Sequence, residues 1–368
     1  MRAKASARGE SAVPSRPKLA AVAALAGVSA STASLAFSGA GPVSETTRAK
    51  VLAAAETLNY AGPDPRAQSL RRGRSGIIGV VIDDRLRDAF RDPVNIAMLD
   101  GLADELGGAG LAMLLLTDTG EGGAAISLAP MDAVVLVGCS TELDSAVRVF
   151  RQRGIPVVAI EAEHMPDVFP IDLDNREATA HGARHLKQLG HEHVAVVSLP
   201  LESSHARGLL TREREAASGS FTARQRLLGA RDVYPNLTGV VSAGSFVEEG
   251  LIAGRALLAG GGRPTAIIAQ SDLLAAGVIR AAEELGIAVP GELSVLGFDG
   301  VRVEGLAPYE LTTLVQPSVE KGRAAGRAAI GLLEGGHPEP VAFSSELRVG
   351  NTTGTAPSGS AELDTRAN

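Results

Sequence analysis

The sequence predicts a small all-helical unit at the front of the chain and a larger, doubly wound α/β body behind it. Between residues 19 and 58, three short apolar-periodic stretches are separated by glycines and a proline. From Gly76 onward, continuous apolar runs alternate with helical stretches, a pattern typical of parallel strands joined by helices. A length of 368 residues allows two or three domains with ample core.

Charge is distributed unevenly along the chain. The net charge of −7 would argue against binding to nucleic acid, but residues 1–75 alone carry a net charge of +7 and the remainder carries −14. A basic front joined to an acidic body is expected when only the front meets phosphate. Residues 1–17 are rich in Arg, Ser, Gly and Pro, and we expect them to form a disordered tail.

The front unit, residues 18–62, has the pattern of a helix-turn-helix. Leu19, Val22, Ala23 and Ala26 fall on one face of a first helix, which Gly27 ends. Ser29 and Ser44 are suitable N-caps for a second and a third helix. Two helices joined by a tight glycine-containing turn and supported by a third describe this motif.

The same residues resemble the DNA-binding headpiece of the lactose-repressor (LacI/GalR) family of bacterial transcription regulators. The resemblance spans about forty positions and rests on a dense set of short motifs, namely Gly27-Val28-Ser29, Thr32 with Ser34, Pro42-Val43-Ser44, Thr47-Arg48, Val51 and Leu58-Asn59-Tyr60. It implies that the second helix enters the major groove and presents its first residues to base edges. The chain departs from the family pattern where Leu35 and Ser38 replace the usual Arg and Asn, and where the first helix opens with Lys18-Leu19-Ala20-Ala21.

The resemblance assigns DNA contacts to this headpiece. Ala30 and Ser31 fall at base-reading positions, while the hydroxyls of Ser29, Thr32 and Ser34 suit backbone phosphates. Leu35 either touches thymine methyl groups or packs within the headpiece. Tyr60 either contacts a phosphate or packs on Leu58.

Residues 63–75 predict a hinge. Two prolines break the preceding helix, and Pro65 can begin a short helix that ends at Gly73. In the family such a helix orders on DNA, and Leu70 matches its minor-groove wedge, with Arg71 beside it. A short isolated helix is marginal in water, so its ordering can act as a switch. The alternative is an unstructured basic linker.

One rival interpretation treats residues 1–40 as a secretory signal peptide, which would make the chain an exported solute-binding protein. Glu10 and two prolines separate the basic residues from the apolar run, however, and the third helix and the arginine-rich segment would be left unexplained. No apolar run approaches the roughly 18 residues that span a membrane. We therefore expect a cytoplasmic protein.

The body, residues 76–350, predicts two doubly wound lobes. Buried parallel strands are expected at Ile77–Ile82, Leu111–Leu116, Ala133–Val137, Val157–Ile160, Val194–Leu199, Ala266–Ala269 and Leu293–Phe298. Helices are expected near 94–107, 142–153, 176–189, 246–259, 272–285 and 319–334.

By its resemblance to the family's two-lobed sensor, akin to periplasmic sugar-binding proteins, this body implies three chain crossings, near 172–176, 315–319 and 340–344. One lobe is expected to comprise about 76–173 plus 319–341, and the other 176–315 plus 342–350. Residues 351–368 are expected to form a disordered tail.

Polar residues follow the expected strands at their carboxyl ends, where ligands bind in such sheets. Several carboxylates there suit a hydroxyl-rich small molecule. The polar set comprises Asp83, Asp84, Thr117, Glu161, Asp174, Ser271, Asp272 and Asp299. Asp272 and Asp174 are each open to a second interpretation, as residues at the start of a helix.

The resemblance adds three effector contacts. It implies that Arg226 is the cleft arginine, that Asp299 is the carboxylate opposite, and that Phe246 stacks on the ligand. Residues 201–220 depart most from the family and form either a mobile flap or a solvated loop.

Enzyme and metal readings find little support. Cys139 is the only cysteine and lies in an apolar run, so we expect a core residue. His191 and His193, one residue apart, would point to opposite faces of a strand, and His185 and His191 match a helix-to-strand turn of the family. A phosphate-binding glycine loop follows a strand and begins a helix, and the glycine runs of this sequence do not have that placement. We expect no enzyme activity, metal or cofactor.

The sequence thus predicts a homodimeric, sequence-specific DNA-binding regulator. A two-fold dimer projects its symmetry onto DNA, so the operator should be roughly palindromic. A small effector, a sugar or sugar derivative, is expected between the lobes, and repression is the expected output. The sequence has no C-terminal apolar heptads of the kind that would favour a tetramer.

Overall fold

The computed structural model describes residues 17–39, 41–82, 89–117, 126, 128–138, 144–260 and 262–357. The chain divides into two compact units, Met1–Ser75 and Gly76–Asn368.

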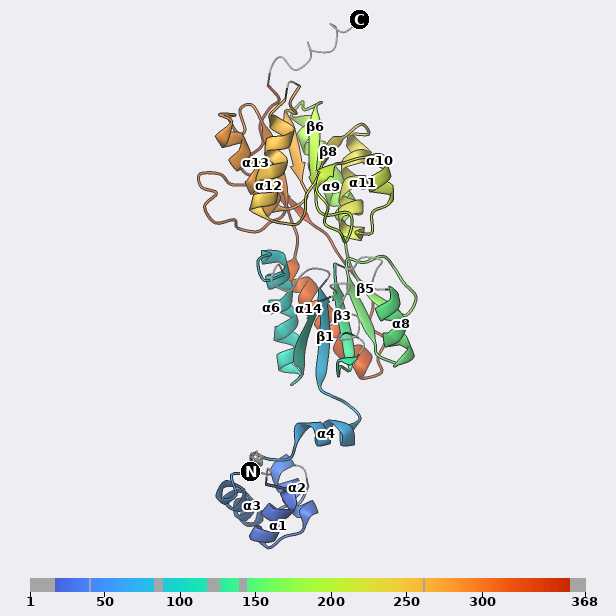
Figure 1. The fold of residues 1–368 in the computed structure, drawn as a ribbon, viewed down its shortest axis with the longest axis vertical. Coiled ribbons are helices and arrows are strands. Elements are labelled where there is room, and N and C mark those ends of the chain that lie inside the picture. The colour runs from blue at the N-terminus through green and yellow to red at the C-terminus, as the bar shows by residue number, and fades with distance from the viewer. Residues whose placement is uncertain are drawn as a thin grey trace, which may run out of the picture. The chain divides into compact units, whose positions relative to one another are not determined.

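The first unit contains the three expected helices (Figure 1). Helix α1 spans Leu19–Ala26, α2 spans Ala30–Ser38 and α3 spans Glu45–Thr57. The predicted caps are confirmed, because Ser29 accepts from the Thr32 N–H and Ser44 from the Thr47 N–H. The small core is built from the helices' inward faces: Val22, Ala23, Ala33, Ala36, Val51, Ala54 and Ala55.

The predicted hinge segment is also helical. Helix α4 spans Pro65–Arg72, and Gly73 follows with a φ of 66°, the left-handed conformation that commonly ends a helix at glycine. Leu70 is 85% exposed, and Arg71 and Arg72 are exposed beside it. The helix therefore presents an apolar side chain and two cations together.

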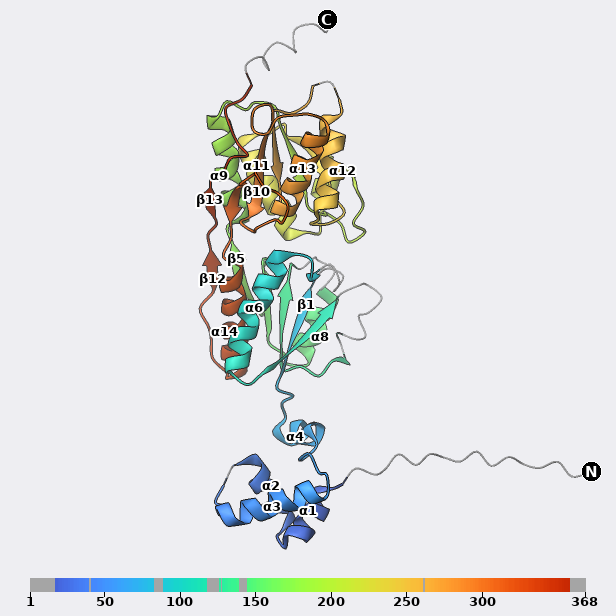
Figure 2. The same ribbon diagram turned by 90° about the vertical axis from the view of Figure 1, so that its left-hand side faces the viewer.

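The first lobe of the second unit, the N-lobe, has a six-stranded parallel sheet in the order β12-β5-β4-β3-β1-β2. Its strands are β1 Ile77–Ile82, β2 Ala112–Thr117, β3 Ala133–Val137, β4 Val157–Ile160, β5 Val168–Leu173 and β12 Val341–Phe343. Helices α6 (Pro93–Gly108) and α14 (Ser318–Leu333) lie side by side, and α8 spans Asp144–Gln152 (Figure 2).

Helices α6 and α14 approach closely because glycines face one another across their contact. A Cβ atom on Gly101 would lie 2.0 Å from the Val319 carbonyl oxygen, and one on Gly322 would lie 2.0 Å from that of Met98. Only glycine fits at either position. The contact holds α14 against the N-lobe although the chain reaches α14 from the other lobe.

The second lobe, the C-lobe, has a seven-stranded sheet in the order β13-β11-β10-β9-β6-β8-β7. Its central strands are parallel, and the edge strands β7 and β13 are antiparallel to their neighbours. The strands are β6 Val194–Ser198, β7 Gly208–Leu209, β8 Thr238–Val241, β9 Ala266–Ala269, β10 Ser294–Asp299, β11 Thr312–Val315 and β13 Glu346–Arg348.

Five helices flank this sheet. They are α9 Asn175–Gln188, α10 Arg212–Ala216, α11 Phe221–Val233, α12 Val247–Leu258 and α13 Asp272–Glu284. Helices α12 and α13 pack together, as do α9 and α11 (Figure 1). The two pairs bury separate apolar clusters.

The chain crosses between the lobes after β5, after β11 and after β12. The expected boundary that assigned residues 342–343 to the second lobe is wrong, because β12 runs to Phe343 and pairs with Leu173 of β5. The strand is only three residues long, too short for an apolar pattern to define its end.

The expectation of a disordered tail from residue 351 is wrong for residues 351–357. Thr352 is fully buried; its hydroxyl accepts from the Thr312 N–H at 2.9 Å and donates to the Val295 carbonyl at 2.8 Å. The Ala356 N–H donates to the Leu189 carbonyl at 2.8 Å. Polar composition suggested disorder, but these polar groups are satisfied by the backbone of the sheet. Residues 358–368 lie outside the described part.

Within the described ranges, no single helix is long and apolar enough to cross a membrane. Helices α1 and α2 meet the criterion only as a pair, and they are bent by 102° with respect to one another.

Candidate DNA-binding surface and ligand site

The first turn of α2 is open to solvent. Ser29, Ala30 and Ser31 are exposed, and the Ser29 hydroxyl lies 2.8 Å from the hydroxyls of both Ser31 and Thr32. Thr32 and Ser34 are half-buried. The positions predicted to read bases and phosphates therefore share one accessible end of a helix, and their roles stay predictions.

Leu35 lies about one turn further along α2 than these residues. Its position is compatible with both alternatives, a contact with thymine and packing within the headpiece. It is 38% exposed, and its methyl groups lie beside Gly41, whose Cβ position would be 3.3 Å from Leu35 Cδ2. One side of the side chain packs on the following turn while the rest faces solvent. This geometry leaves apolar surface available for a thymine methyl group.

Tyr60 packs in the headpiece against Phe37, not only against Leu58. The two rings meet edge to face with centroids 5.5 Å apart and planes 72° apart. Burial and the nearby Asp64 raise the pKa of the Tyr60 phenol. Its hydroxyl thus stays protonated and able to donate a hydrogen bond.

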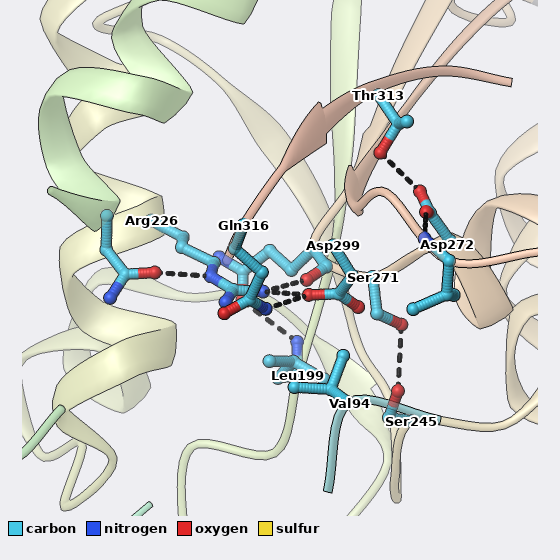
Figure 3. Close-up of polar contacts among 12 residues, drawn as sticks. Val94, Leu199, Arg226, Ser245, Ser271, Asp272, Asp299, Thr313 and Gln316 are labelled. Atoms are coloured by element: carbon cyan, nitrogen blue, oxygen red, sulfur yellow. Dashed lines mark hydrogen bonds and ion pairs between the residues drawn. The ribbon is translucent and has the colours of Figure 1, made fainter. Parts of the chain in front are cut away.

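In the second unit, polar side chains form a buried cluster where the lobes meet, and Figure 3 shows its members Arg226, Asp299 and Gln316. Arg226 of α11 is 3% exposed and Asp299, the last residue of β10, is 7% exposed. Arg226 Nη1 lies 3.4 Å from Asp299 Oδ1, so the two residues that the resemblance paired are in contact.

Arg226 has further partners that fix its orientation. Its Nε donates to Asn175 Oδ1 at 2.8 Å, and its Nη1 donates to the Gln270 carbonyl at 2.5 Å. The guanidinium carbon lies 3.6 Å from the centroid of the Phe298 ring, a cation–π contact. The sequence did not predict helix α11, because its Arg-rich segment has no clear apolar stripe, so only the resemblance could single out Arg226.

Asp299 has an unusual backbone and an unusual acidity. Its φ of 116° lies in a region that side chains rarely adopt. Burial raises its pKa to about 7, against the lowering effect of Arg226; Asp92 raises it further, and Gln316 and Lys321 lower it. The carboxyl group therefore changes charge near neutral pH, as groups at functional sites often do.

Glu161 and Lys321 complete the cluster from the N-lobe. Lys321 Nζ donates to Glu161 Oε1 and to Gln316 Oε1. Burial alone raises the pKa of Glu161, but Lys321, Arg226 and Asn175 together lower it below its usual range. Glu161 thus stays an anion. The sequence indicated Glu161 but gave no signal for Lys321, Gln316 or Asn175, because their partners are far away along the chain.

Asp272 and Asp174 lie outside this cluster's bonds. Asp272 is fully buried, accepts from Thr313 Oγ1 at 2.5 Å and from the Val301 N–H at 2.8 Å, and burial with the nearby Asp299 holds its pKa well above the usual range (Figure 3). Asp174 accepts from the Ser345 N–H at 2.9 Å. Neither side chain caps its own helix; Asp272 joins the start of α13 to β11 and to the turn after β10, and Asp174 joins the start of α9 to the segment between β12 and β13.

Phe246 faces the N-lobe at a second point of contact between the lobes. The guanidinium carbon of Arg91 lies 4.9 Å from the Phe246 ring centroid, and Arg91 Nη2 lies 3.6 Å from Glu248 Oε1. Phe246 is half-buried, so part of its ring is available to a ligand. Asp83, also predicted as an effector contact, lies outside the described residues, as does Cys139.

The N-lobe places its apolar core beside the cluster. A cavity with room for about one water molecule lies at the carboxyl ends of β1, β3 and β4. Ile160 and Gly322, the sequence neighbours of Glu161 and Lys321, line it, and Ile160 is itself buried. The polar groups thus stand against a buried apolar core.

Residues 201–220 are pinned to the C-lobe, contrary to the alternative of a mobile flap. Strand β7 pairs with β8, and Arg207 donates to Glu249 through Nε and Nη2 at 2.6–3.1 Å. Glu249 also accepts from the Ala243 N–H at 2.9 Å. The segment therefore supports the loop that leads to Phe246.

His191 is a structural residue, as predicted. It is fully buried, and its ring nitrogens lie 2.9 Å from the hydroxyls of Thr265 and Ser294. It precedes strand β6 and is not part of a strand. The described ranges contain no group of three or more His, Cys, Asp or Glu side chains that could hold a metal ion.

Comparison with known proteins covers both units. The family model for "Bacterial regulatory proteins, lacI family" matches residues 18–62, and the model for a "Periplasmic binding protein-like domain" matches residues 183–353. An HTH-type transcriptional regulator of Mycolicibacterium smegmatis is 32% identical over 93% of this chain and 97% of its own length. One of Mycobacterium tuberculosis is 33% identical over 92% and 97%.

Solved structures share the fold. A LacI-family regulator from Corynebacterium glutamicum is 26% identical and superposes with a TM-score of 0.68 over 92% of this chain and 98% of its own. The CelR–cellobiose complex is 24% identical, with a TM-score of 0.64 over 92% and 100%. The Lac repressor dimer bound to operator and an anti-inducer is 23% identical, with a TM-score of 0.74 over 92% and 99%.

A helix-turn-helix unit followed by a two-lobed α/β unit defines the class of DNA-binding transcriptional regulators with a periplasmic-binding-protein-like domain. The chain belongs to the LacI family of bacterial regulators. Its relatives are regulators and not enzymes. The alternative of an exported binding protein is not favoured, because residues 18–62 match the family's DNA-binding domain.

Proposed function

We propose that the chain is a homodimeric, cytoplasmic repressor that binds a pseudo-palindromic operator under the control of a carbohydrate-like effector held between the lobes. The observation that carries the effector part is the contact between Arg226 and Asp299. A guanidinium and a carboxylate at one point offer both donors and acceptors, which is what a ligand rich in hydroxyl groups requires.

The surroundings of this pair suit the same class of ligand. The half-buried ring of Phe246 offers apolar surface to the C–H face of a sugar ring. A solved structure with the same fold is a complex with cellobiose. That likeness supports a carbohydrate, although it does not choose among sugars.

The DNA part rests on exposed side chains of the first unit. Ser29, Ala30 and Ser31 stand at the open end of α2, and Leu70 with Arg71 stands on α4. An exposed leucine flanked by arginines suits a widened and kinked minor groove. The Lac repressor, similar in fold, is a dimer on its operator, which supports a symmetric complex and repression.

A ligand screen tests the effector part. The full chain is subjected to thermal-shift measurements with a panel of mono- and disaccharides, sugar derivatives and nucleosides. Arg226→Ala should abolish the shift caused by any sugar that stabilises the wild-type chain. Arg231→Ala is the matched control, because Arg231 lies on the same helix but pairs with Glu215 at 2.8 Å, outside the cluster. A shift retained in Arg226→Ala would contradict the assignment.

A selection from genomic fragments tests the DNA part. The full chain should enrich a few fragments that share a two-fold symmetric sequence, and analytical ultracentrifugation should show two chains per site. Enrichment no better than for random DNA, at moderate salt and with the candidate sugars present or absent, would contradict the proposal.

A further inference from the structure

The buried side chains where the lobes meet form a closed ring of hydrogen bonds and ion pairs. Lys321 donates to Glu161 and to Gln316. Gln316 donates to Asp299, which also contacts Arg226. Arg226 donates to Asn175, and Asn175 donates to Glu161, which closes the ring. The Gln316–Asp299 and Asn175–Glu161 bonds measure 2.6 Å each. Every member is 7% exposed or less.

The ring passes from one lobe to the other through two of the chain crossings. Glu161 follows β4 and Lys321 lies on α14, both in the N-lobe, whereas Arg226 and Asp299 belong to the C-lobe. Asn175 begins α9 directly after the first crossing, and Gln316 lies in the second crossing, between β11 and α14. Both hydrogen-bonded links of the ring between the lobes therefore run through a residue at a crossing, and Arg226 Nη2 also lies 4.0 Å from Glu161 Oε2, a direct ion pair between the lobes.

Stability alone does not account for such a ring. Burying two cations and two carboxyl groups costs desolvation energy that their attraction only partly returns, and an apolar core of the same volume is often equally stable. What a fully bonded polar ring adds is a defined geometry, because every donor needs its partner in place. The geometry fixed here is that of the two lobes.

We propose that this ring is an internal latch that sets the arrangement of the lobes, with Lys321 and Glu161 as positioning residues that hold it from the N-lobe. The predicted ligand contacts Arg226 and Asp299 are members of the ring. A ligand hydroxyl that hydrogen-bonds to Arg226 or Asp299 competes with Asn175 and Gln316 for the same donor and acceptor atoms. Binding therefore loosens or replaces the latch. This last step rests on the proposed function; the latch itself does not.

The experiment measures a distance between the lobes without ligand or DNA. In a Cys139→Ser background, spin labels are placed at Ala103→Cys on α6 and Ala256→Cys on α12, both exposed, one in each lobe. The labelled chain is mixed with excess unlabelled chain, so that pulsed electron–electron dipolar spectroscopy reports only distances within one chain. Lys321→Met combined with Glu161→Gln removes one positive and one negative charge, so the net charge of the ring does not change.

The matched control is Arg231→Met with Glu215→Gln. It removes a buried ion pair of the same kind, with Nη2–Oε2 2.8 Å apart, that lies wholly inside the C-lobe. The ring variant should broaden the distance distribution or move its maximum, while the control keeps the wild-type distribution. If the ring variant matches the wild type, the latch is overturned.

A second variant guards against misfolding. Gln316→Leu removes the amide that joins Lys321 to Asp299 and changes no charge, and it should alter the distribution in the same direction. Circular dichroism and thermal melting check that each variant is folded. A chain that shows the latch but binds no sugar would refute the proposed effector and leave the ring intact, so the two failures are distinguishable.

Discussion

The side-chain amide of Gln316 donates to the carboxylate of Asp299 at 2.6 Å, and this bond joins the second chain crossing to the carboxyl group expected to bind a ligand. Asp299 Oδ1 also receives Arg226 Nη1 at 3.4 Å. The same oxygen thus serves the crossing and the predicted site. A change of charge at Asp299 should therefore affect both the chain crossing and the predicted ligand site.

The pH dependence of stability should reveal Asp299. Its pKa is about 7 in the folded chain and near 3.8 when unfolded, so between these values the folded state holds the proton more tightly. Its contribution to the free energy of unfolding is greatest at low pH and falls as pH rises from about 4 to 7, by at most about 1.4 kcal/mol per unit. Urea titrations from pH 5 to 8 should show that Asp299→Asn removes this slope.

Ligand affinity should also depend on the ionisation of Asp299, but it should rise with pH where the stability contribution falls. The ionised carboxylate accepts hydrogen bonds from two hydroxyl groups, whereas the protonated form must use one oxygen as a donor. Affinity for a sugar found in the screen should therefore rise as pH increases through 7. Asp299→Asn should be weaker and flat with pH; a wild-type affinity that is itself flat from pH 6 to 8 would argue against direct contact.

Leu70→Ala should weaken operator binding. The side chain is 85% exposed in the chain alone, and inserting it between bases would bury apolar surface worth about 1.5–3 kcal/mol, or roughly tenfold to a hundredfold in affinity. Fluorescence anisotropy with an enriched fragment measures the loss. Leu209→Ala, an exposed leucine of the other unit, is the control. Equal affinities for both variants would remove the argument for a wedge.

The segment after β13 should matter for stability, because its residue Thr352 is bonded to two strands of the sheet. Thr352→Val keeps the shape but removes the hydroxyl that bonds Thr312 and Val295, leaving a buried N–H and a buried carbonyl unpaired at a cost of about 1–3 kcal/mol. Thr352→Ser retains the hydroxyl and should lose much less. Chemical denaturation measures both, and an unchanged midpoint for Thr352→Val would contradict the role given to this bond.

What the sequence could predict here was mainly local. The caps at Ser29 and Ser44 and the glycine after α4 act on residues a few positions away, so their pattern is visible along the chain. Asp299 and Glu161 were indicated because they follow apolar strands. Their function could be guessed from position, but their partners could not.

The rest of the site depends on contacts between distant residues. Lys321 can be fully buried because Glu161 and Gln316 accept hydrogen bonds from its ammonium group, and a lysine on a helix gives no sign of this in the sequence. Residues 351–357 looked disordered because Thr352 and its neighbours are polar. The groups that satisfy them belong to β10 and β11, 40 to 60 residues away along the chain.

The loop before Phe246 should set ligand affinity through Arg207. Arg207 bonds Glu249, and Glu249 bonds the Ala243 N–H, so this pair holds the turn from which Phe246 projects. The Arg207 side chain is 56% exposed, but that of Glu249 is only 8% exposed, so removing the arginine leaves a nearly buried carboxylate without its counter-ion. Arg207→Ala should therefore lower the melting temperature and weaken sugar binding by about tenfold, or about 1.4 kcal/mol, as measured by calorimetry at a temperature where the variant is folded.

Arg255→Ala is the control for this last prediction, because Arg255 makes an exposed two-bond pair with Glu284 at 2.8–2.9 Å and lies on α12, the helix that also carries Glu249. Removing it deletes an ion pair that is exposed on both sides, without touching the turn at Ala243. If both variants bind sugar as the wild type does, Phe246 is held by its own packing or takes no part in binding. Loss in Arg207→Ala alone would place the aromatic ring in the ligand site and make residues 201–220 its support.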